Sequence, residues 1–315
     1  MAESYWATQE DGFAGGIHSR KLPPDWPLVE EWLLTLQAAG RSMGTIAVYR
    51  RHLAAWADWL VGRGRALAQA RPEDVRLYLA ERLRGFWRPA TARAAHSYLS
   101  AFYCWLVAEG EIAAPPTRGV PRPRPPETIV RALSPDEVRR LLAACTRDRL
   151  GLRDQAIVLV LYDTGLRAAE LLSLQVDPAG RYEQVVVMGK GGRERTVRLG
   201  DVARRAVMRY ARAWRLASGA LWRERHGRPL GYSGLHHIIS SLGERAGLGR
   251  VTPHMLRHSF AQALLRETGD WDAVRVLGGW RTSDVMLRYL RGREMERALE
   301  VHRRFSPADR LGGHA

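Results

Sequence analysis

A proline-rich segment near the middle of the chain places the strongest constraint on its fold. Residues 113–126 read AAPPTRGVPRPRPP and contain six prolines and three arginines. Proline lacks an amide hydrogen and fixes its φ angle at about −65°, so this stretch cannot be helical. It predicts an extended linker over residues 113–131 that divides the 315-residue chain into two domains. The linker arginines can follow a phosphate backbone or belong to a stiff solvated spacer, and both interpretations can hold together.

The part before the linker predicts a small all-helical domain over residues 25–112. Apolar residues recur at intervals of three and four through residues 27–60, and again from about residue 90 to 108. This period is typical of amphipathic helices. Pro72, followed by two acidic residues, begins a further helix whose first turn suits the helix dipole. Residues 1–24 read as a flexible tail.

The part after the linker predicts a second, larger domain over residues 132–304, followed by a flexible tail over 305–315. It opens with Ser134 as a helix N-cap and Pro135 at the first helical position. Three stretches are β-like: residues 172–176, 184–188 and 196–199. The last two flank a glycine-rich turn, which indicates a β-hairpin. The predicted fold class is therefore mainly α with a small antiparallel β-sheet.

The charge balance restricts the partner. Lys and Arg number 49 against 33 Asp and Glu, a net charge of +16 at pH 7. A surplus of this size favours nucleic acid over a membrane surface, because no basic amphipathic anchor is evident. A nucleotide bias toward arginine codons is the plainer alternative. No stretch approaches 18 uncharged apolar residues and the N-terminus lacks an apolar core, so neither a membrane span nor a signal peptide is expected.

Two cysteines and two lysines add to this picture. Cys104 and Cys145 lie in apolar runs 41 positions apart, which fits a reducing compartment, here the cytoplasm of a bacterium. Lysine occurs only at Lys21 and Lys190, so 47 of the 49 basic residues are arginine. Arginine stays protonated in proteins whereas lysine can give up a proton, so Lys190 is a candidate for proton transfer. Its ordinary alternative is a solvated turn lysine. A nucleotide P-loop is disfavoured because Gly191, not Ser or Thr, follows the lysine.

Two further segments combine arginine with an acid or with histidines. Arg167 is expected to start a helix, with Glu170 on the same face, either holding the guanidinium for chemistry or forming a plain ion pair. His254, Arg257 and His258 share one face of another predicted helix. The histidine spacing resembles a zinc site, but no catalytic glutamate follows the first histidine and no third ligand is evident. Histidine beside arginine better suits an oxyanion that needs a charge clamp and a proton carrier.

The last segment joins a tryptophan to a tyrosine. Two glycines end a helix, Trp280 lies in the turn, and Tyr289 lies about two turns into the next predicted helix. A single tyrosine is usually a core or surface residue. Together with two arginines, a lysine, a histidine and an indole N–H, however, it makes a set suited to one phosphodiester. No carboxylate cluster is available for Mg²⁺, so we expect no metal and no cofactor, with the guanidiniums neutralising charge instead.

The ordered set TGLRAAEL, MGKGGRER, HMLRHSFA, GGW and Tyr289 resembles the tyrosine recombinase, or phage integrase, family over about residues 27–300. Trp280 and Tyr289 lie nine positions apart, as do the last two catalytic positions of the family. The resemblance implies a SAM-like helical core-binding domain, which binds DNA, and an α+β catalytic domain. Histidine is more frequent than tryptophan at position 280, but the indole N–H can still donate. No arm-binding domain is recognised before residue 27, so the layout is closer to the Xer and Cre types.

The resemblance also implies a role for each matching residue. The residues at the catalytic positions are Arg167, Lys190, His254, Arg257, Trp280 and Tyr289. The two arginines would clamp the scissile phosphate, and the tyrosine would attack it to form a 3′-phosphotyrosyl link. The lysine would protonate the leaving 5′-oxygen, the histidine would transfer a proton and bond the phosphate, and the tryptophan would donate its indole N–H. Glu170 and His258 would support these residues from behind.

The family implies an assembly as well. A homotetramer would act on two specific double-stranded DNA sites through a Holliday junction, for integration, excision or resolution of a DNA element at the nucleoid. The segment after Tyr289 would pack on a neighbouring subunit, with or without a second recombinase or accessory factor. Two alternatives differ in class: a type IB topoisomerase, which relaxes supercoils as a monomer, and a catalytically silent DNA-binding protein. The filled catalytic positions disfavour the silent protein, and strand exchange would separate recombinase from topoisomerase.

Overall fold

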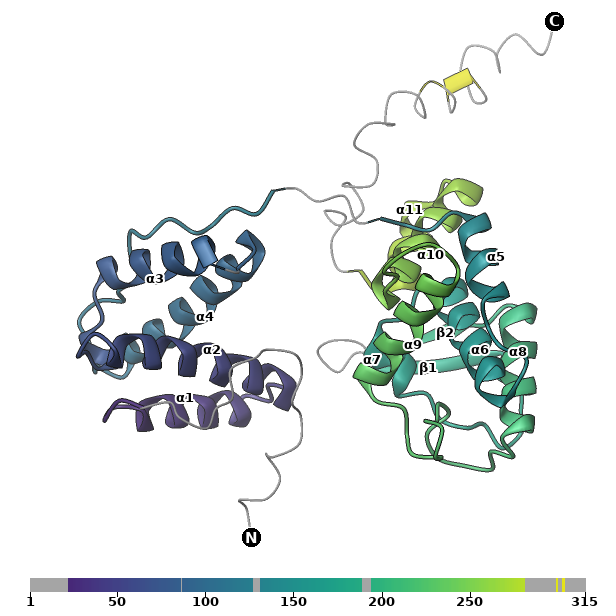
Figure 1. Cartoon of the computed structure of the whole chain (residues 1–315), viewed down its shortest axis with the longest axis horizontal. Helices are drawn as coiled ribbons and strands as arrows, with labels where there is room; N and C mark the ends of the chain where they lie inside the picture. The colour runs from purple at the N-terminus through teal and green to yellow at the C-terminus, as the bar shows by residue number, and fades with distance from the viewer. Residues whose placement is uncertain are drawn as a thin grey trace, which may run out of the picture. The chain divides into compact units, whose positions relative to one another are not determined.

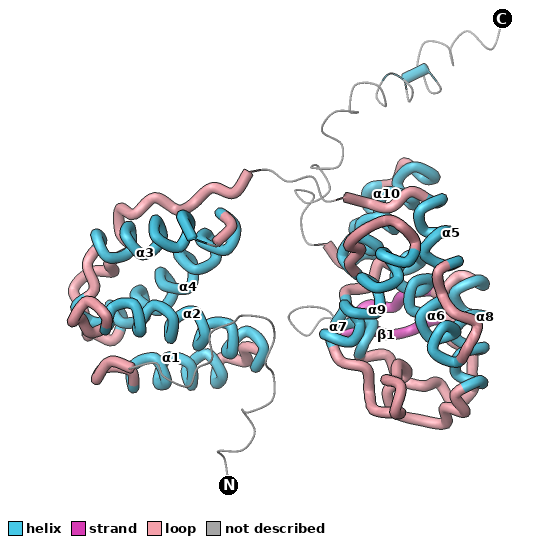
Figure 2. Tube along the Cα trace, in the orientation of Figure 1, coloured by secondary structure: helices cyan, strands magenta, loops and turns pink. Residues whose placement is uncertain are grey.

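A computed structural model of the chain describes residues 22–85, 87–126, 131–188, 194–280, 299 and 302–303. The chain forms two compact units, an N-terminal unit, Met1–Thr128, and a C-terminal unit, Ile129–Ala315. In the described residues the N-terminal unit has helices and no strand, and the C-terminal unit combines helices with a two-stranded sheet (Figures 1 and 2). This confirms the predicted fold class.

The described residues of the N-terminal unit form four α-helices around an aromatic core. They are α1 (Pro27–Ala38), α2 (Met43–Val61), α3 (Pro72–Gly85) and α4 (Pro89–Ala108), with a short 3-10 turn at Leu67–Gln69. Two large core side chains pair their polar atoms: Trp56 Nε1 donates to Tyr103 Oη at 2.7 Å, and that hydroxyl donates to the Leu67 carbonyl at 3.0 Å. Because both groups find partners, the two large rings are buried without leaving a polar atom of either unsatisfied.

The first part of the proline-rich segment packs on this unit. Thr117 and Val120 are buried. His96, on α4, donates from Nε2 to the Val120 carbonyl at 3.2 Å. A turn closed by the Arg118 amide and the Pro115 carbonyl at 2.9 Å makes this approach possible. The linker pattern therefore describes residues 121–126 better than the residues before them, which belong to the fold of the N-terminal unit.

The C-terminal unit contains a hairpin and seven α-helices among its described residues. The helices are α5 (Pro135–Ala143), α6 (Arg149–Thr164), α7 (Ala168–Leu172), α8 (Asp201–Ala213), α9 (Tyr232–Arg245), α10 (Pro253–Thr268) and α11 (Trp271–Gly278). The strands β1 (Gln184–Met188) and β2 (Glu194–Arg198) pair antiparallel. Helix α6 packs against α8, α9 and α10, so it lies at the centre of the unit (Figure 1). The predicted N-cap is confirmed at α5, where the Ser134 hydroxyl accepts from the Glu137 amide at 3.2 Å.

One predicted β stretch is wrong. Leu172 ends α7, and the residues that follow contribute a single bridge, between Gln175 and Ala220. Leu174 and Val176 are buried, which explains the alternating pattern in the sequence. Two backbone hydrogen bonds join this segment to residues 219–221. The alternation of apolar residues therefore reflects burial of a loop and not a β-strand.

Candidate active site

Arg167 follows a sharp end to helix α6. Gly165 caps this helix with a φ angle of 61°, and a Cβ atom there would lie 2.3 Å from the ring of Phe260. Only glycine accommodates both the left-handed conformation and the close ring. Arg167 then becomes the N-cap of α7, and its backbone amide donates to Glu170 Oε2 at 2.8 Å. The turn thus fixes the backbone from which the Arg167 side chain extends.

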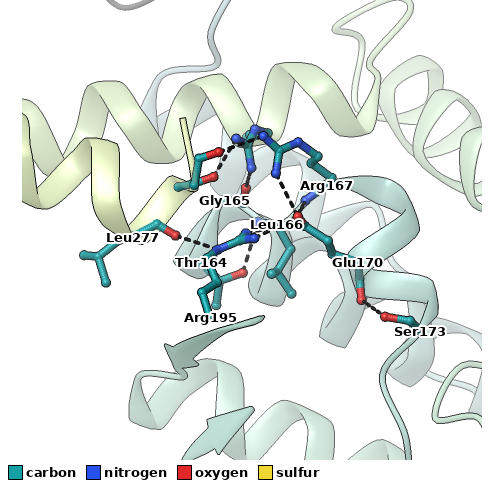
Figure 3. Close-up of polar contacts among 11 residues, drawn as sticks. Thr164, Gly165, Leu166, Arg167, Glu170, Ser173, Arg195 and Leu277 are labelled. Carbon is teal, nitrogen blue, oxygen red and sulfur yellow. Dashed lines mark hydrogen bonds and ion pairs between the residues drawn. The ribbon is translucent and has the colours of Figure 1, made fainter. Parts of the chain in front are cut away.

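Glu170 holds two arginines at once (Figure 3). Its Oε1 atom accepts from Arg167 Nη1 and from Arg195 Nη1, each at 2.8 Å, and its Oε2 atom accepts from Arg195 Nη2 at 2.8 Å. The Glu170 side chain is only 3% exposed. Burial favours the neutral carboxyl group, but hydrogen bonds from Arg195 and Arg167 outweigh it and lower the pKa of Glu170 to about 2. The carboxylate is therefore charged at neutral pH.

Arg257 is buried, and no carboxylate among the described residues pairs with it. It donates from Nη1 to the Gly165 carbonyl and from Nη2 to the Gly278 carbonyl, the latter at 2.6 Å. Its guanidinium lies over the Trp280 ring, 4.1 Å from the ring centroid. Burial and the neighbouring charge of Arg167 lower the pKa of Arg257 to about 9, so it remains a cation at neutral pH.

The C-terminal end of α11 collects all three arginines, which we call the arginine cluster: Arg167, Arg195 and Arg257. Three consecutive carbonyls, at positions 277, 278 and 279, accept one hydrogen bond from each. Arg195 Nε donates to Leu277 at 3.3 Å, and Arg167 Nη2 donates to Gly279 at 2.8 Å. The last carbonyls of a helix have no partner within the helix and carry partial negative charge, so they suit guanidinium donors.

The two candidate histidines form a pair on α10. A hydrogen bond of 2.7 Å joins the Nε2 atoms of His254 and His258. His258 is fully buried, and burial, His254 and Arg257 lower its pKa to about 3. His254 is exposed, yet partial desolvation and the charges of Arg257 and Arg167 lower its pKa as well. Both imidazoles are neutral at pH 7, and one hydrogen is shared between the facing Nε2 atoms.

The structure brings together most of the predicted site residues that it describes. Arg167, Glu170, Arg257 and Trp280 form one connected group, and the charges of Arg257 and Arg167 act on His254. The predicted proton donor and nucleophile, Lys190 and Tyr289, lie outside the described residues.

Arg195 is the member of the group that sequence reasoning missed. Arg195 lies two positions before buried Val197 on β2, and it pairs across the hairpin with buried Val187. Period-two alternation therefore places it on the inward face of the hairpin, where an arginine requires an acidic or carbonyl partner. That pattern is the signal in the sequence that could have identified it.

The chemistry of the site is that of an anion receptor. Three guanidiniums face one carboxylate, which leaves an excess of positive charge, and the Arg167 side chain is 37% exposed. Guanidinium groups bind phosphate oxygens through paired, charge-assisted hydrogen bonds. Among the described residues, no group of three or more His, Cys, Asp or Glu side chains is placed to hold a metal ion. In the same part of the chain, no helix has the length and apolar character that crossing a membrane requires.

Both units match known protein families: residues 131–295 match the phage integrase family, and residues 29–110 match the phage integrase N-terminal SAM-like domain. The chain belongs to this family, the tyrosine recombinases, and is an enzyme of site-specific recombination that cleaves and rejoins DNA.

Curated relatives cover most of the chain. It is 34% identical to the tyrosine recombinase XerD of Ralstonia nicotianae over 250 residues, 76% of this chain and 81% of that protein. It is 35% identical to the tyrosine recombinase XerC of Xylella fastidiosa over 265 residues, 80% of this chain and 87% of that protein. The topoisomerase alternative finds no support among these relatives.

Solved structures share the fold. The XerH site-specific recombinase bound to a palindromic difH substrate matches with a TM-score of 0.68 and 18% identity, covering 90% of this chain and 91% of that one. A lambda integrase tetramer bound to a Holliday junction matches with a TM-score of 0.63 and 16% identity, covering 81% and 77%. At these identities the likeness establishes the fold alone.

Proposed function

We propose that the exposed side of the arginine cluster binds the scissile phosphate of DNA, with Arg167 and Arg257 as its two clamps. The observation that carries this proposal is the way both guanidiniums are fixed. Backbone carbonyls at positions 165, 278 and 279 hold them, and among the described residues only Arg167 of the two shares a carboxylate. Carbonyl partners orient a guanidinium without cancelling its charge, so the charge stays available for the developing oxyanion.

The covalent step follows from the family positions. Tyr289 Oη attacks the phosphorus, forming the Oη–P bond while the bond from phosphorus to the 5′-oxygen breaks. The tyrosine proton passes to His254, and Lys190 donates a proton to the departing 5′-oxygen to give a free hydroxyl. The reverse sequence rejoins a strand and releases the tyrosine. The energy of the broken bond is kept in the phosphotyrosine, so the cycle requires no ATP.

Three further residues complete the proposed site. Trp280 donates its indole N–H to the phosphate and covers one face of the Arg257 guanidinium, 4.1 Å from the ring centroid. Glu170 orients Arg167. His258 fixes the tautomer of His254 through the hydrogen bond of 2.7 Å between their Nε2 atoms.

The proposed assembly is a tetramer on double-stranded DNA. The related folds include a lambda integrase tetramer bound to a Holliday junction and XerH bound to a difH site. The net charge of +16 suits such a polyanionic partner. We include in this proposal packing of the segment after Tyr289 on a neighbouring subunit, a location in the cytoplasm at the nucleoid, and a possible requirement for a second recombinase or accessory factor.

A covalent-trapping assay tests this proposal. The wild-type protein first selects its binding site from a randomised duplex pool, and the selected site is rebuilt with a nick that lets the cleaved end diffuse away. The DNA is then incubated in EDTA with wild type, with Tyr289→Phe, and with Tyr162→Phe as a matched control on α6. We expect a covalent adduct on a denaturing gel for wild type and the control, but none for Tyr289→Phe.

Two results would contradict the proposal. One is an adduct that persists in Tyr289→Phe, which would place the nucleophile elsewhere. The other is relaxation of supercoiled plasmid by a monomer, with no exchange between two selected sites, which would favour topoisomerase activity.

A further inference from the structure

Arg195 contacts more elements of the site than a plain ion pair requires. From β2 it reaches Glu170 on α7 through two hydrogen bonds of 2.8 Å, and the Leu277 carbonyl at the end of α11 through one of 3.3 Å. These partners lie 25 and 82 positions away in the sequence. Figure 3 shows the Arg195 side chain between the two. One guanidinium therefore joins three separate elements.

The position of Arg195 does not suit direct contact with DNA. Its side chain is 16% exposed, against 37% for Arg167. All three of its nitrogen atoms already donate to protein oxygens. The space around it is shaped for this arrangement, because a Cβ atom on Gly279 would lie 3.1 Å from the Arg195 guanidinium carbon. Arg195 thus lies behind the exposed face of the arginine cluster.

Its effect on Arg167 passes through Glu170. Arg195 occupies one hydrogen-bonding position on each carboxylate oxygen, and this bidentate contact sets the plane of the carboxylate. The other position on each oxygen belongs to Arg167, through its backbone amide and its Nη1 atom. If Arg195 is lost, the carboxylate keeps only its two hydrogen bonds from Arg167, so the plane of the carboxylate and the direction of the Arg167 side chain are held less firmly.

Its effect on the hairpin comes from its place in the chain. Arg195 is the second residue of β2, which directly follows the segment 189–193 that contains Lys190. Its bonds to α7 and α11 hold this strand against the same helix end, where the neighbouring carbonyls of Gly278 and Gly279 hold Arg257 and Arg167. The strand that follows Lys190 in the chain is therefore anchored to the same helix end as the phosphate clamps.

We propose that Arg195 is a positioning residue for DNA cleavage, which aligns Arg167 through Glu170 and anchors the lysine-bearing hairpin to the end of α11. This inference rests on the proposed function, since it assumes that Arg167 clamps the scissile phosphate. A misplacement of about 1 Å in such a group can slow a reaction by about 100-fold while leaving substrate binding intact.

The test compares Arg195→Gln and Arg195→Lys with wild type on the selected, nicked DNA site. Arg198→Gln is the matched control, because Arg198 lies on the same strand but is 74% exposed and pairs with exposed Glu183 at 3.3 Å. Each protein is measured for DNA affinity, for single-turnover cleavage at saturating DNA, and for its melting temperature. We expect Arg195→Gln to cleave about 10- to 100-fold more slowly with DNA affinity within about twofold of wild type. Arg195→Lys should fall between, since it keeps the charge and loses the bidentate contact.

A second substrate separates positioning from general damage to the fold. A methylphosphonate at the scissile position replaces one charged oxygen by a methyl group, so the arginine clamps have less charge to neutralise. On this substrate the deficit of Arg195→Gln relative to wild type should shrink to less than about threefold. A protein that is merely destabilised would show the same deficit on both substrates.

Each outcome decides the matter. Wild-type cleavage rates for Arg195→Gln, or an equal deficit on both substrates, would overturn the positioning role. If Arg195→Gln fails to fold, Arg195→Lys is judged by the same two rates. An adduct in Tyr289→Phe would instead overturn the proposed function, and the Tyr289→Phe reaction is run beside every series for that reason.

Discussion

Replacing Glu170 by glutamine isolates the contribution of a single buried charge. The side chain is 3% exposed and accepts from both Arg167 and Arg195. Glutamine keeps the shape but removes the charge, and it turns one acceptor into a donor that faces a guanidinium. The arginine cluster then lacks any counter-ion among the contacts that the structure describes.

The magnitude follows from the pKa of Glu170, which falls from 4.5 to about 2 in the folded protein. A lowering of this size corresponds to about 3 kcal/mol in favour of the folded, ionised state. Breaking a buried ion pair by removing one partner costs about as much, 3–5 kcal/mol. Because the carboxyl pKa is lowered on folding, the stabilisation is complete well above pH 4.5 and disappears as the pH falls from 4.5 toward 2.

The measurement is scanning calorimetry of the full chain at pH 7 and at pH 4. We expect Glu170→Gln to lower the melting temperature of the C-terminal unit by about 6–12 °C at pH 7, and by less at pH 4. Glu183→Gln is the control, since this glutamate is 62% exposed and also pairs with an arginine, at 3.3 Å. Exposed pairs contribute about 0–1 kcal/mol, so the control should melt close to wild type. If both variants melt within about 1 °C of each other, the buried pair is not the stabilising contact that we infer.

Two further predictions address Trp280 and His258. In Gly278→Ala a Cβ atom would lie 1.7 Å from the Trp280 ring, so the ring must move away from Arg257. We expect cleavage to fall about tenfold or more with DNA affinity retained. The control is Gly44→Ala, where the added Cβ atom meets open space, and this variant should cleave like wild type. For His258, burial lowers the pKa to about 3 in the folded protein. Below pH 6.5 this histidine therefore binds a proton in the unfolded chain but not in the folded chain, so the free energy of unfolding decreases as the pH falls. Wild type should lose unfolding free energy when the pH is lowered from 6.5 to 5, and in His258→Gln this loss, measured by urea titration, should be smaller by about 2 kcal/mol. An unchanged slope would show that His258 does not titrate in this way.

The local elements were predictable because their signals are local. The helix start at Ser134 follows from residues adjacent in sequence, and so does the ion pair of Arg167 with Glu170, three positions apart. The hairpin was also recognisable, although its second strand begins at Glu194, two residues earlier than predicted. In each case the interacting groups lie within one or two turns of chain, so spacing alone defines the geometry.

The contacts that assemble the site were not predictable in the same way. Arg195 meets Glu170 and Leu277 only after β2, α7 and α11 have packed, and no spacing along the chain encodes that meeting. At residues 172–176 the sequence predicted a strand that the structure does not have, because alternate residues are buried there without strand pairing. Patterns in sequence report which face of a segment is buried, and tertiary packing decides what that face touches.

The end of α11 explains how three arginines can lie together and still keep charge for the phosphate that we propose they bind. Pairing each guanidinium with its own carboxylate would remove the repulsion within the cluster, but it would also cancel the charge that the anion needs. The chain instead uses one carboxylate and the carbonyls of Leu277, Gly278 and Gly279, which carry only partial charge. These carbonyls are available because a helix leaves its last acceptors unpaired, and the positive φ of 65° at Gly279 turns the chain directly after them. The arginine cluster is therefore fixed by one carboxylate together with backbone dipoles, and the charge left over is the part of the site that the proposed phosphate would neutralise.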